Sequence, residues 1–317
     1  AASSRRKPLC SPASMTLEFG EVLQNGNFYH ENYRHAESKF TYVSDGISRE
    51  IRPRFTFFGF RYVKVSGLER VDAACFEGRA IYSEMDRTGF IRTGNEKINR
   101  LFSNSLWGLK SNFLDIPTDC PQRDERLGWT GDAQVFSTTA GFHMDTRAFY
   151  RKFLRDLRSD QQRNNGAAAI YLPNAFPGLC AGIWSDAATF IPKMLYDYYG
   201  SKTQLEENYP LMKDWVDYIF RADCARGRRN LYDFGFQFGD WLALDGSTEQ
   251  STFGRTDSGY ICSLYYYAST CYVAQAAEIL QKPEADEYRL PNGRRTQVDG
   301  IQPSGKALIK QFYSHRA

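Results

Sequence analysis

The sequence predicts a mainly α-helical protein whose helices follow a shorter β-rich region. Aromatic and β-branched residues alternate with polar ones between residue 15 and about residue 91. From about residue 95 the apolar residues instead recur every three to four positions, which is the period of an amphipathic helix. With 317 residues, the chain is long enough for one large domain or two ordinary ones.

The β-rich region contains three strand-like segments. Met15–Phe19 alternates apolar and polar residues, Phe40 and Tyr42 continue the pattern, and Arg54–Val65 is rich in aromatic and β-branched residues. Glycines that favour turns separate these segments, at Gly26, Gly46, Gly59 and Gly67. We therefore expect a β-sandwich over residues 15–91.

Helical spacing marks five later segments. These are Ile98–Phe113, Phe136–Leu157, Asp186–Tyr199, Pro210–Phe220 and Asp257–Leu280. The third segment is followed by Gly200, a typical residue just beyond a helix end. Long loops at 114–132, 161–183 and 223–256 separate the helices, and long loops in a compact helical domain are where functional residues concentrate.

Charge and hydropathy exclude several classes of protein. The formal net charge of +3 provides no electrostatic reason to expect a nucleic-acid partner. No run of eighteen apolar residues is present, so no membrane partner is expected. The basic residues near the N-terminus are not followed by an apolar segment, so no signal peptide is visible and a cytoplasmic location is expected.

Cysteine usage indicates a reducing compartment. The seven cysteines are an odd number, they are widely spaced, and none forms a CxxC pair. With only four histidines in addition, the sequence predicts no metal site and no cofactor.

The loop from Asp115 to Asp132 concentrates the chemistry. It contains five carboxylic acids, two arginines and Trp129, together with two prolines that stiffen it. Carboxylates at this density raise one another's pKa, which allows one of them to stay protonated and donate a proton. On composition alone, an exposed, salt-bridged surface loop is the better interpretation.

Resemblance to a known family favours a functional loop over a surface loop. The loop resembles the signature of glycoside hydrolase family 78, the α-L-rhamnosidases. The resemblance covers residues 15 to about 288 and extends to further motifs, which are Phe55–Val63, Tyr82–Phe90, Asn112–Asp119, Trp184–Asp186 and Phe238–Trp241. It implies a partial (α/α)6 toroid at 92–288 preceded by a partial β-sandwich at 15–91.

The resemblance also implies a mechanism and a set of site residues. The family hydrolyses terminal α-L-rhamnosides with inversion, which requires an acid that protonates the leaving oxygen and a base that activates water. Glu125 resembles the general acid. The remaining residues resemble groups that bind the sugar: Asp119, Arg123 and Asp132 on its hydroxyls, Trp129, Trp184 and Trp241 as an aromatic wall, and Asp186 and Asp240 beside that wall.

The sequence departs from the family at its two ends and at the base. Residues 1–14 are unassigned, and the tail 289–317 looks divergent. Asp299 is the one acid after Glu287, and its surroundings do not resemble the family's base motif. We therefore expect a truncated member with impaired hydrolysis that binds a rhamnose-containing glycoside and self-associates through the open edge of its toroid. Four alternatives stay open. Asp240 acts as the base, the chain is a non-catalytic carbohydrate-binding remnant, it is a misfolded remnant that binds nothing, or it belongs to a related toroid family that acts on another sugar.

Overall fold

The structure, a computed structural model, describes residues 14–246, 248 and 250–288. The described chain divides into two compact units. The sheet unit comprises residues up to 82 together with 107–114 and 118–126, and the helical unit comprises 83–106, 115–117 and the residues from 127 onward. The predicted segments 1–13 and 289–317 lie outside the described residues, as does Asp299.

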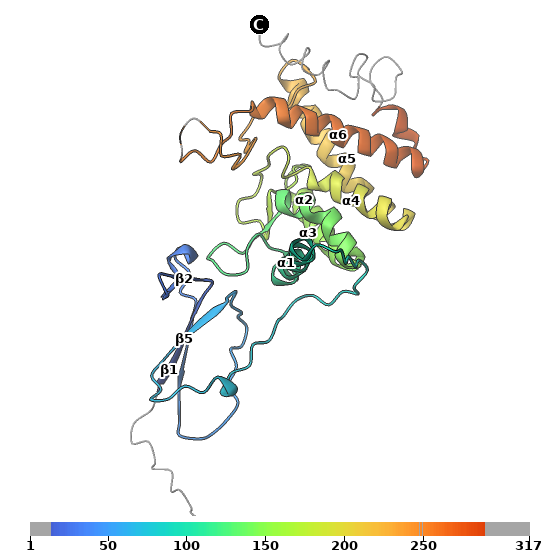
Figure 1. Cartoon of the computed structure of the whole chain (residues 1–317). Coiled ribbons are helices and arrows are strands. Elements are labelled where there is room, and N and C mark those ends of the chain that lie inside the picture. The colour runs from blue at the N-terminus through green and yellow to red at the C-terminus, as the bar shows by residue number, and fades with distance from the viewer. Residues whose placement is uncertain (1–13, 247, 249, 289–317) are drawn as a thin grey trace, which may run out of the picture. The chain divides into compact units, whose positions relative to one another are not determined.

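An antiparallel three-stranded sheet forms the centre of the sheet unit (Figure 1). Strand β1 (Ser14–Gly20) lies between β4 (Lys39–Val43) and β5 (Tyr62–Ser66), with Leu17 paired to Phe40 on one side and to Val65 on the other. A short hairpin of β2 (Val22–Gln24) and β3 (Asn27–Tyr29) follows β1, and the 3-10 turn η1 (Glu31–Tyr33) follows the hairpin. The predicted strands at Met15–Phe19 and at Phe40 and Tyr42 are confirmed.

The predicted strand over Arg54–Val65 is wrong in its first half. Only Tyr62–Ser66 pairs with a neighbouring strand, and the residues before it have no regular structure. The side chain of Phe58 instead stacks on Phe19, with ring centroids 4.2 Å apart. Aromatic residues in this segment provide packing surface, which the sequence pattern does not distinguish from strand propensity.

Six α-helices are present in the described residues (Figure 1). They are α1 (Glu96–Asn112), α2 (Thr130–His143), α3 (Arg147–Arg163), α4 (Ala187–Tyr199), α5 (Lys202–Ala225) and α6 (Ser258–Ile279). Short strands lie between them, at β6 (Phe113–Leu114), β7 (Ile116–Pro117), β8 (Gly128–Trp129) and β9 (Tyr171–Leu172), and the 3-10 turns η2 (Ala73–Cys75) and η3 (Pro283–Asp286) complete the elements.

Two helix predictions need correction. The single helix expected over Phe136–Leu157 is two helices, because α2 ends at His143 and α3 begins at Arg147. The helix expected from Pro210 begins eight residues earlier, at Lys202, where the hydroxyl of the N-cap residue Ser201 accepts a hydrogen bond from the Gln204 N–H. Proline usually begins a helix, but here it lies inside one.

Helix α4 lies at the centre of the helical unit. It packs against α2, α3, α5 and α6, and Figure 1 shows α4, α5 and α6 side by side. Asp186 precedes α4 and joins three of these helices, because its carboxylate accepts hydrogen bonds from Trp215 of α5 at 2.9 Å and Ser269 of α6 at 2.6 Å. No helix of the described chain is long and apolar enough to cross a bilayer.

Candidate functional site

Asp119, Arg123 and Glu125 form a compact charged cluster in the sheet unit. One guanidinium nitrogen of Arg123, Nη2, lies 3.1 Å from Asp119 Oδ2 and 3.1 Å from Glu125 Oε2. The side chain of Asp119 is 6% exposed and that of Glu125 is 20% exposed. The structure therefore brings together the predicted acid and two of the three residues predicted to bind sugar hydroxyls.

The loop that carries this cluster is anchored to the segment before β5. Gly59 lies so close to the loop that an added Cβ would come within 2.9 Å of the Pro121 backbone. The buried Tyr33 donates its hydroxyl hydrogen to the Gly59 carbonyl at 2.7 Å. Arg126 donates to the carbonyl of Phe57 at 3.1 Å and also lies over the Phe57 ring. The aromatic motif at 55–60 thus holds the acidic loop.

Two consecutive residues after η1 contact two consecutive residues of the same loop. Arg34 Nη1 lies 2.8 Å from Glu125 Oε2, and the His35 backbone N–H donates to Asp124 Oδ2 at 3.3 Å. The ring nitrogen Nδ1 of His35 lies at the same distance from that oxygen. Glu125 Oε2 therefore has two guanidinium partners, one from the loop itself and one from outside it.

Electrostatics in the loop follow from these contacts. Desolvation acts to lower the pKa of Arg123, but its hydrogen bonds with Asp119 and Cys120 outweigh this effect and raise the pKa. Desolvation acts to raise the pKa of Asp124, whereas the hydrogen bonds from His35 and the charge of Arg34 leave it lowered. Both shifts favour the charged forms of Arg123 and Asp124.

Asp119, Cys120 and Glu125 have the donor atoms that a metal ion would need. One ligand atom from each lies within 4.8 Å of the others. Arg123, however, already bridges the two carboxylates, and burial raises the pKa of the Cys120 thiol, which disfavours the thiolate that binds metals. These residues fit a cluster neutralised by arginine better than a metal centre.

The three predicted tryptophans meet in the helical unit around a fourth aromatic residue, Phe238. Its ring centroid lies 6.0 Å from Trp129, 4.3 Å from Trp184 and 5.3 Å from Trp241. Trp129 also packs against Tyr171, its partner in the β8–β9 ladder. Trp184 is buried and Trp241 is 37% exposed. The predicted aromatic residues therefore form one continuous cluster with an accessible end.

Glycines make this close aromatic packing feasible. A Cβ at Gly131, in the first turn of α2, would come within 2.8 Å of the Trp184 ring. Gly239 has a φ of +61°, a conformation that favours glycine, and it turns the chain between Phe238 and Trp241.

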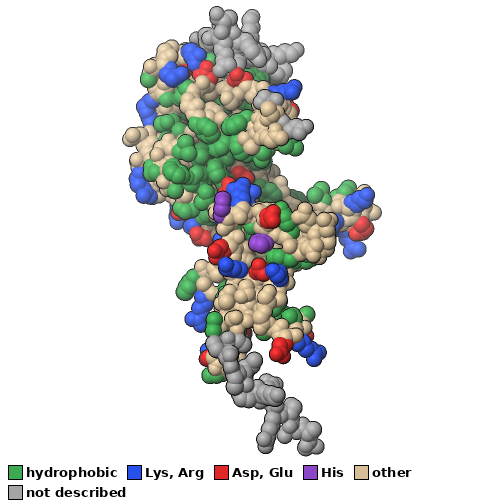
Figure 2. Space-filling model, turned by 90° about the vertical axis from the view of Figure 1, so that its left-hand side faces the viewer, with side chains coloured by type: hydrophobic (Ala, Val, Ile, Leu, Met, Phe, Trp, Pro, Cys, Tyr) green, Lys and Arg blue, Asp and Glu red, His purple; other side chains and the backbone are tan. Residues whose placement is uncertain are grey.

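On the face of the helical unit seen in Figure 2, hydrophobic side chains gather over a broad area.

The remaining predicted site residues have different environments. Asp132 lies exposed in the first turn of α2. Asp240 is half-buried, and its Oδ2 accepts a hydrogen bond from the Thr256 hydroxyl at 3.0 Å. Asp186 is fully buried, and besides its two helix partners it accepts from the Ile183 N–H at 2.7 Å. These hydrogen bonds indicate that Asp186 stabilises the fold around Trp184.

Sequence reasoning missed two residues of these clusters. Arg34 contacts Glu125 across 91 positions of sequence, and nothing in its local pattern marks it. Phe238 belongs to one of the family motifs, but the sequence does not identify it as the residue that joins the tryptophans. Its position in a long loop, two residues before an acid–tryptophan pair, is a signal that could have identified it.

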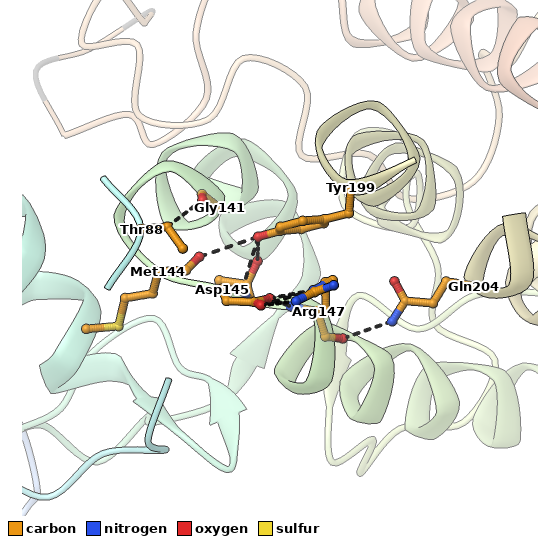
Figure 3. Close-up of polar contacts among 8 residues, drawn as sticks. Thr88, Gly141, Met144, Asp145, Arg147, Tyr199 and Gln204 are labelled. Atoms are coloured by element: carbon orange, nitrogen blue, oxygen red, sulfur yellow. Dashed lines mark hydrogen bonds and ion pairs between the residues drawn. The ribbon is translucent and has the colours of Figure 1, made fainter. Parts of the chain in front are cut away.

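A separate hollow lies elsewhere in the helical unit. It has a volume of about 850 Å³ and is lined by both acids and bases. Figure 3 shows part of its wall, where Arg147 pairs with Asp145 and Gln204 donates to the Arg147 carbonyl. Next to the wall, the Tyr199 hydroxyl donates to the Met144 carbonyl. It contains none of the predicted site residues. Most of its cations already have carboxylate partners, so it is a poor candidate for the site.

A sheet-bearing unit followed by a helical unit, with an acidic loop and a cluster of indoles, is the arrangement of a six-hairpin glycosidase with an accessory β-domain. The family model of the bacterial α-L-rhamnosidase six-hairpin glycosidase domain matches residues 86–297, and that of the bacterial α-L-rhamnosidase concanavalin-like domain matches residues 9–82. The chain belongs to the α-L-rhamnosidase family. The expected fold class, a partial six-hairpin helical domain after a partial β-domain, is confirmed.

Several relatives support this assignment. An α-L-rhamnosidase of Alteromonas sp. is 37% identical over 98% of this chain and 32% of the relative. The crystal structure of an Aspergillus terreus α-L-rhamnosidase matches with a TM-score of 0.82 and 33% identity, over 96% of this chain and 34% of that one. A Streptomyces avermitilis α-L-rhamnosidase complexed with L-rhamnose matches with a TM-score of 0.78 and 34% identity, over 88% of this chain and 26% of that one. The chain thus spans about a third of the length of the curated relatives it matches.

Proposed function

We propose that this chain supplies the general-acid half of inverting hydrolysis of terminal α-L-rhamnosides, with Glu125 as the proton donor. The observation that carries the proposal is the cluster in which Arg123 bridges Asp119 and Glu125. In the reaction, Glu125 gives its proton to the glycosidic oxygen, which leaves with the electron pair of the broken C1–O bond. Water then bonds to C1 on the opposite face and loses a proton to a base.

The rhamnose ring is the ligand class that the remaining residues suit. Asp119, Arg123 and Asp132 supply acceptors and donors for sugar hydroxyls, and the indoles supply apolar faces for the ring and its methyl group. The relative from Streptomyces avermitilis is described as a complex with L-rhamnose, which supports the same ligand here. Asp186 serves in this proposal by fixing the segment that carries Trp184.

Hydrolysis by this chain is expected to be weak, because none of its residues resembles the family's general base. Asp240 is the alternative base, since it is half-buried and adjoins Trp241 of the aromatic cluster.

We also propose that the chain self-associates through exposed apolar helix surfaces. We further propose a reducing compartment, since the seven cysteines of the sequence are odd in number and widely spaced.

Azide separates the step that needs the general acid from the step that needs a general base. Azide is a nucleophile that needs no deprotonation, so an inverting site that retains its acid converts an aryl α-L-rhamnoside into the β-L-rhamnosyl azide and the free phenol. We expect azide to accelerate release of 4-nitrophenol by the 317-residue chain. E125Q should lower that rate about 100-fold or more, the usual contribution of a general acid. The products are identified by mass spectrometry and NMR.

E18Q is the matched control for E125Q. Glu18 is also a partly exposed glutamate of the sheet unit in an ion pair, with Lys64 at 2.8 Å, so its substitution should leave the rate unchanged. D240N tests the alternative base. It should not alter turnover in azide, and loss of the slow turnover in water alone would assign the base to Asp240.

A non-catalytic sugar-binding module is the second candidate function, favoured by the accessible end of the aromatic cluster. Titration calorimetry with L-rhamnose distinguishes the two. Binding heat without turnover in azide would support the binding module and refute the acid role. A chain that neither binds rhamnose nor releases phenol would refute both.

A further inference from the structure

Arg34, a cation outside the acidic loop, contacts the carboxylate of Glu125. Its Nη1 lies 2.8 Å from Glu125 Oε2, the oxygen that Arg123 also contacts at 3.1 Å. Two guanidinium groups converging on one carboxylate oxygen fix the plane of the carboxyl group.

The backbone around Arg34 is unusual and well anchored. Arg34 has a φ of +59°, which a non-glycine residue maintains only where surrounding contacts enforce it. Its N–H donates to the Glu31 carbonyl at 3.1 Å, and the Ala36 N–H donates to the Tyr33 carbonyl at 3.1 Å. Tyr33 is fully buried. A strained turn beside an anchored tyrosine therefore presents the guanidinium to the loop.

His35 reinforces the contact from the adjacent position. Its backbone N–H and its ring nitrogen Nδ1 both approach Asp124 Oδ2. Arg34 thus holds Glu125 and His35 holds Asp124, so the two pairs of residues meet in opposite order along the two segments. Such a double attachment restricts rotation of the loop about Glu125 more than a single ion pair does.

We propose that Arg34 is a positioning residue for the general acid, whose carboxyl group it holds through Oε2. This assignment rests on the proposed role of Glu125 as the acid. Arg34 itself does not touch the sugar. Removal of the Arg34 guanidinium should therefore lower the reaction rate most for substrates whose leaving groups need a proton in order to depart.

The test compares two leaving groups on the full chain in azide. The 2,4-dinitrophenolate group leaves without protonation, whereas 4-methoxyphenol needs the acid. R34A keeps the Cβ, and with it the same backbone conformation, but removes the guanidinium. We expect R34A to lower the rate on 4-methoxyphenyl α-L-rhamnoside about 10- to 100-fold, as misplacement of a catalytic group does. The rate on the dinitrophenyl substrate should change less than about twofold.

Two further variants sharpen the comparison. R34K keeps a cation but loses the planar fork, so it should recover part of the lost rate. R49A removes another exposed arginine of the sheet unit that pairs with a carboxylate, that of Asp45, and should change neither rate. Hydrogen–deuterium exchange provides an activity-independent measurement, and R34A should speed exchange in residues 118–126 while R49A should not.

Each other outcome overturns a specific statement. Equal losses on both substrates mean that Arg34 supports the fold rather than the acid, and unchanged exchange in 118–126 means that it does not hold the loop. If the unsubstituted chain releases neither phenol, the proposed function itself is refuted. Faster hydrogen–deuterium exchange in R34A would then show only that Arg34 holds the loop, not that it positions an acid. If the unsubstituted chain is active and R34A matches it, the positioning role alone fails.

Discussion

Asp186 is a fully buried carboxyl group whose hydrogen bonds connect α4, α5 and α6. Asparagine at this position has one acceptor oxygen. Its amide nitrogen would face the Ile183 N–H, which is also a donor. A neutral carboxylic acid avoids this conflict, because its hydroxyl oxygen still accepts. At pH 4, D186N should therefore lower the free energy of unfolding by about 1–3 kcal/mol, as measured by denaturant titration.

The same residue predicts a pH dependence with a definite sign. Burial raises the pKa of Asp186 above its ordinary value, against the opposing effect of its hydrogen bonds from Ser269, Trp215 and Ile183. Between the ordinary and the raised value, the folded chain holds a proton that the unfolded chain has lost. The stability contributed by Asp186 is thus complete at acidic pH and decreases as the pH rises through that interval.

Unfolding curves at several pH values check this sign. The stability difference between the unsubstituted chain and D186N should shrink as the pH rises from 4 towards neutrality. D197N removes an exposed carboxylate paired with Lys193 and should show no such trend. A difference that grows with pH would contradict the buried-acid interpretation.

At the scale of residues, the sequence predicts what is local. The acidic loop stands out by its composition, and the family resemblance assigned roles to its residues. Asp119, Arg123 and Glu125 converge because they lie within seven positions of one another. Arg34 could not be predicted in this way. Its contact with Glu125 depends on how the segment after η1 meets a loop 91 residues later.

At the scale of elements, Gly200 ends α4 with a φ of +65°, and its N–H donates to the Tyr196 carbonyl. No neighbouring atom would obstruct a side chain there, so the cost of G200A is the backbone conformation alone. We expect the free energy of unfolding to fall by about 1–2 kcal/mol. Asparagine tolerates this conformation better, so G200N should cost less than G200A in the same denaturant titration. Equal stability of G200A and the unsubstituted chain would contradict the prediction.

The aromatic cluster is organised by the loop that carries Phe238. Each aromatic pair adds about 0.5–1.5 kcal/mol beyond burial, and Phe238 contacts three indoles. F238A should therefore reduce the near-ultraviolet circular dichroism of the tryptophans and lower the unfolding free energy by about 2–4 kcal/mol. Phe236, which is exposed and contacts Phe238 at 4.8 Å, is the control. If F236A has the larger effect, Phe238 is not the centre of the cluster.

Helix prediction succeeded where the apolar period was uninterrupted and failed where packing decided the boundary. The end of α4 followed from Gly200. The break between α2 and α3 did not follow, because Phe136 and Phe149 keep a similar apolar texture on either side of it. Pro210 looked like a helix start, but the cap provided by Ser201 and the packing of α5 against α4 and α6 extend the helix in front of it.

At the scale of the whole molecule, apolar side chains remain exposed on helices of the helical unit. On α1, Ile98 is 48% and Leu101 is 68% exposed, and on α2, Phe142 is 40% exposed. The rings of Phe102 and Phe142 lie 6.0 Å apart, so α1 and α2 are in contact here. Exposed apolar surface promotes association in water, and a net charge of only +3 opposes it weakly.

We therefore expect the chain to self-associate with a dependence on concentration, which sedimentation velocity measures directly. L101Q removes the most exposed apolar side chain of α1 and should shift the distribution towards the monomer, because each buried leucine contributes about 1.5–3 kcal/mol to an interface that covers it. K97Q places the same residue type on the same helix without removing apolar surface, and it should leave the distribution unchanged. Association that persists in L101Q to the same extent as in K97Q would locate the contact away from α1.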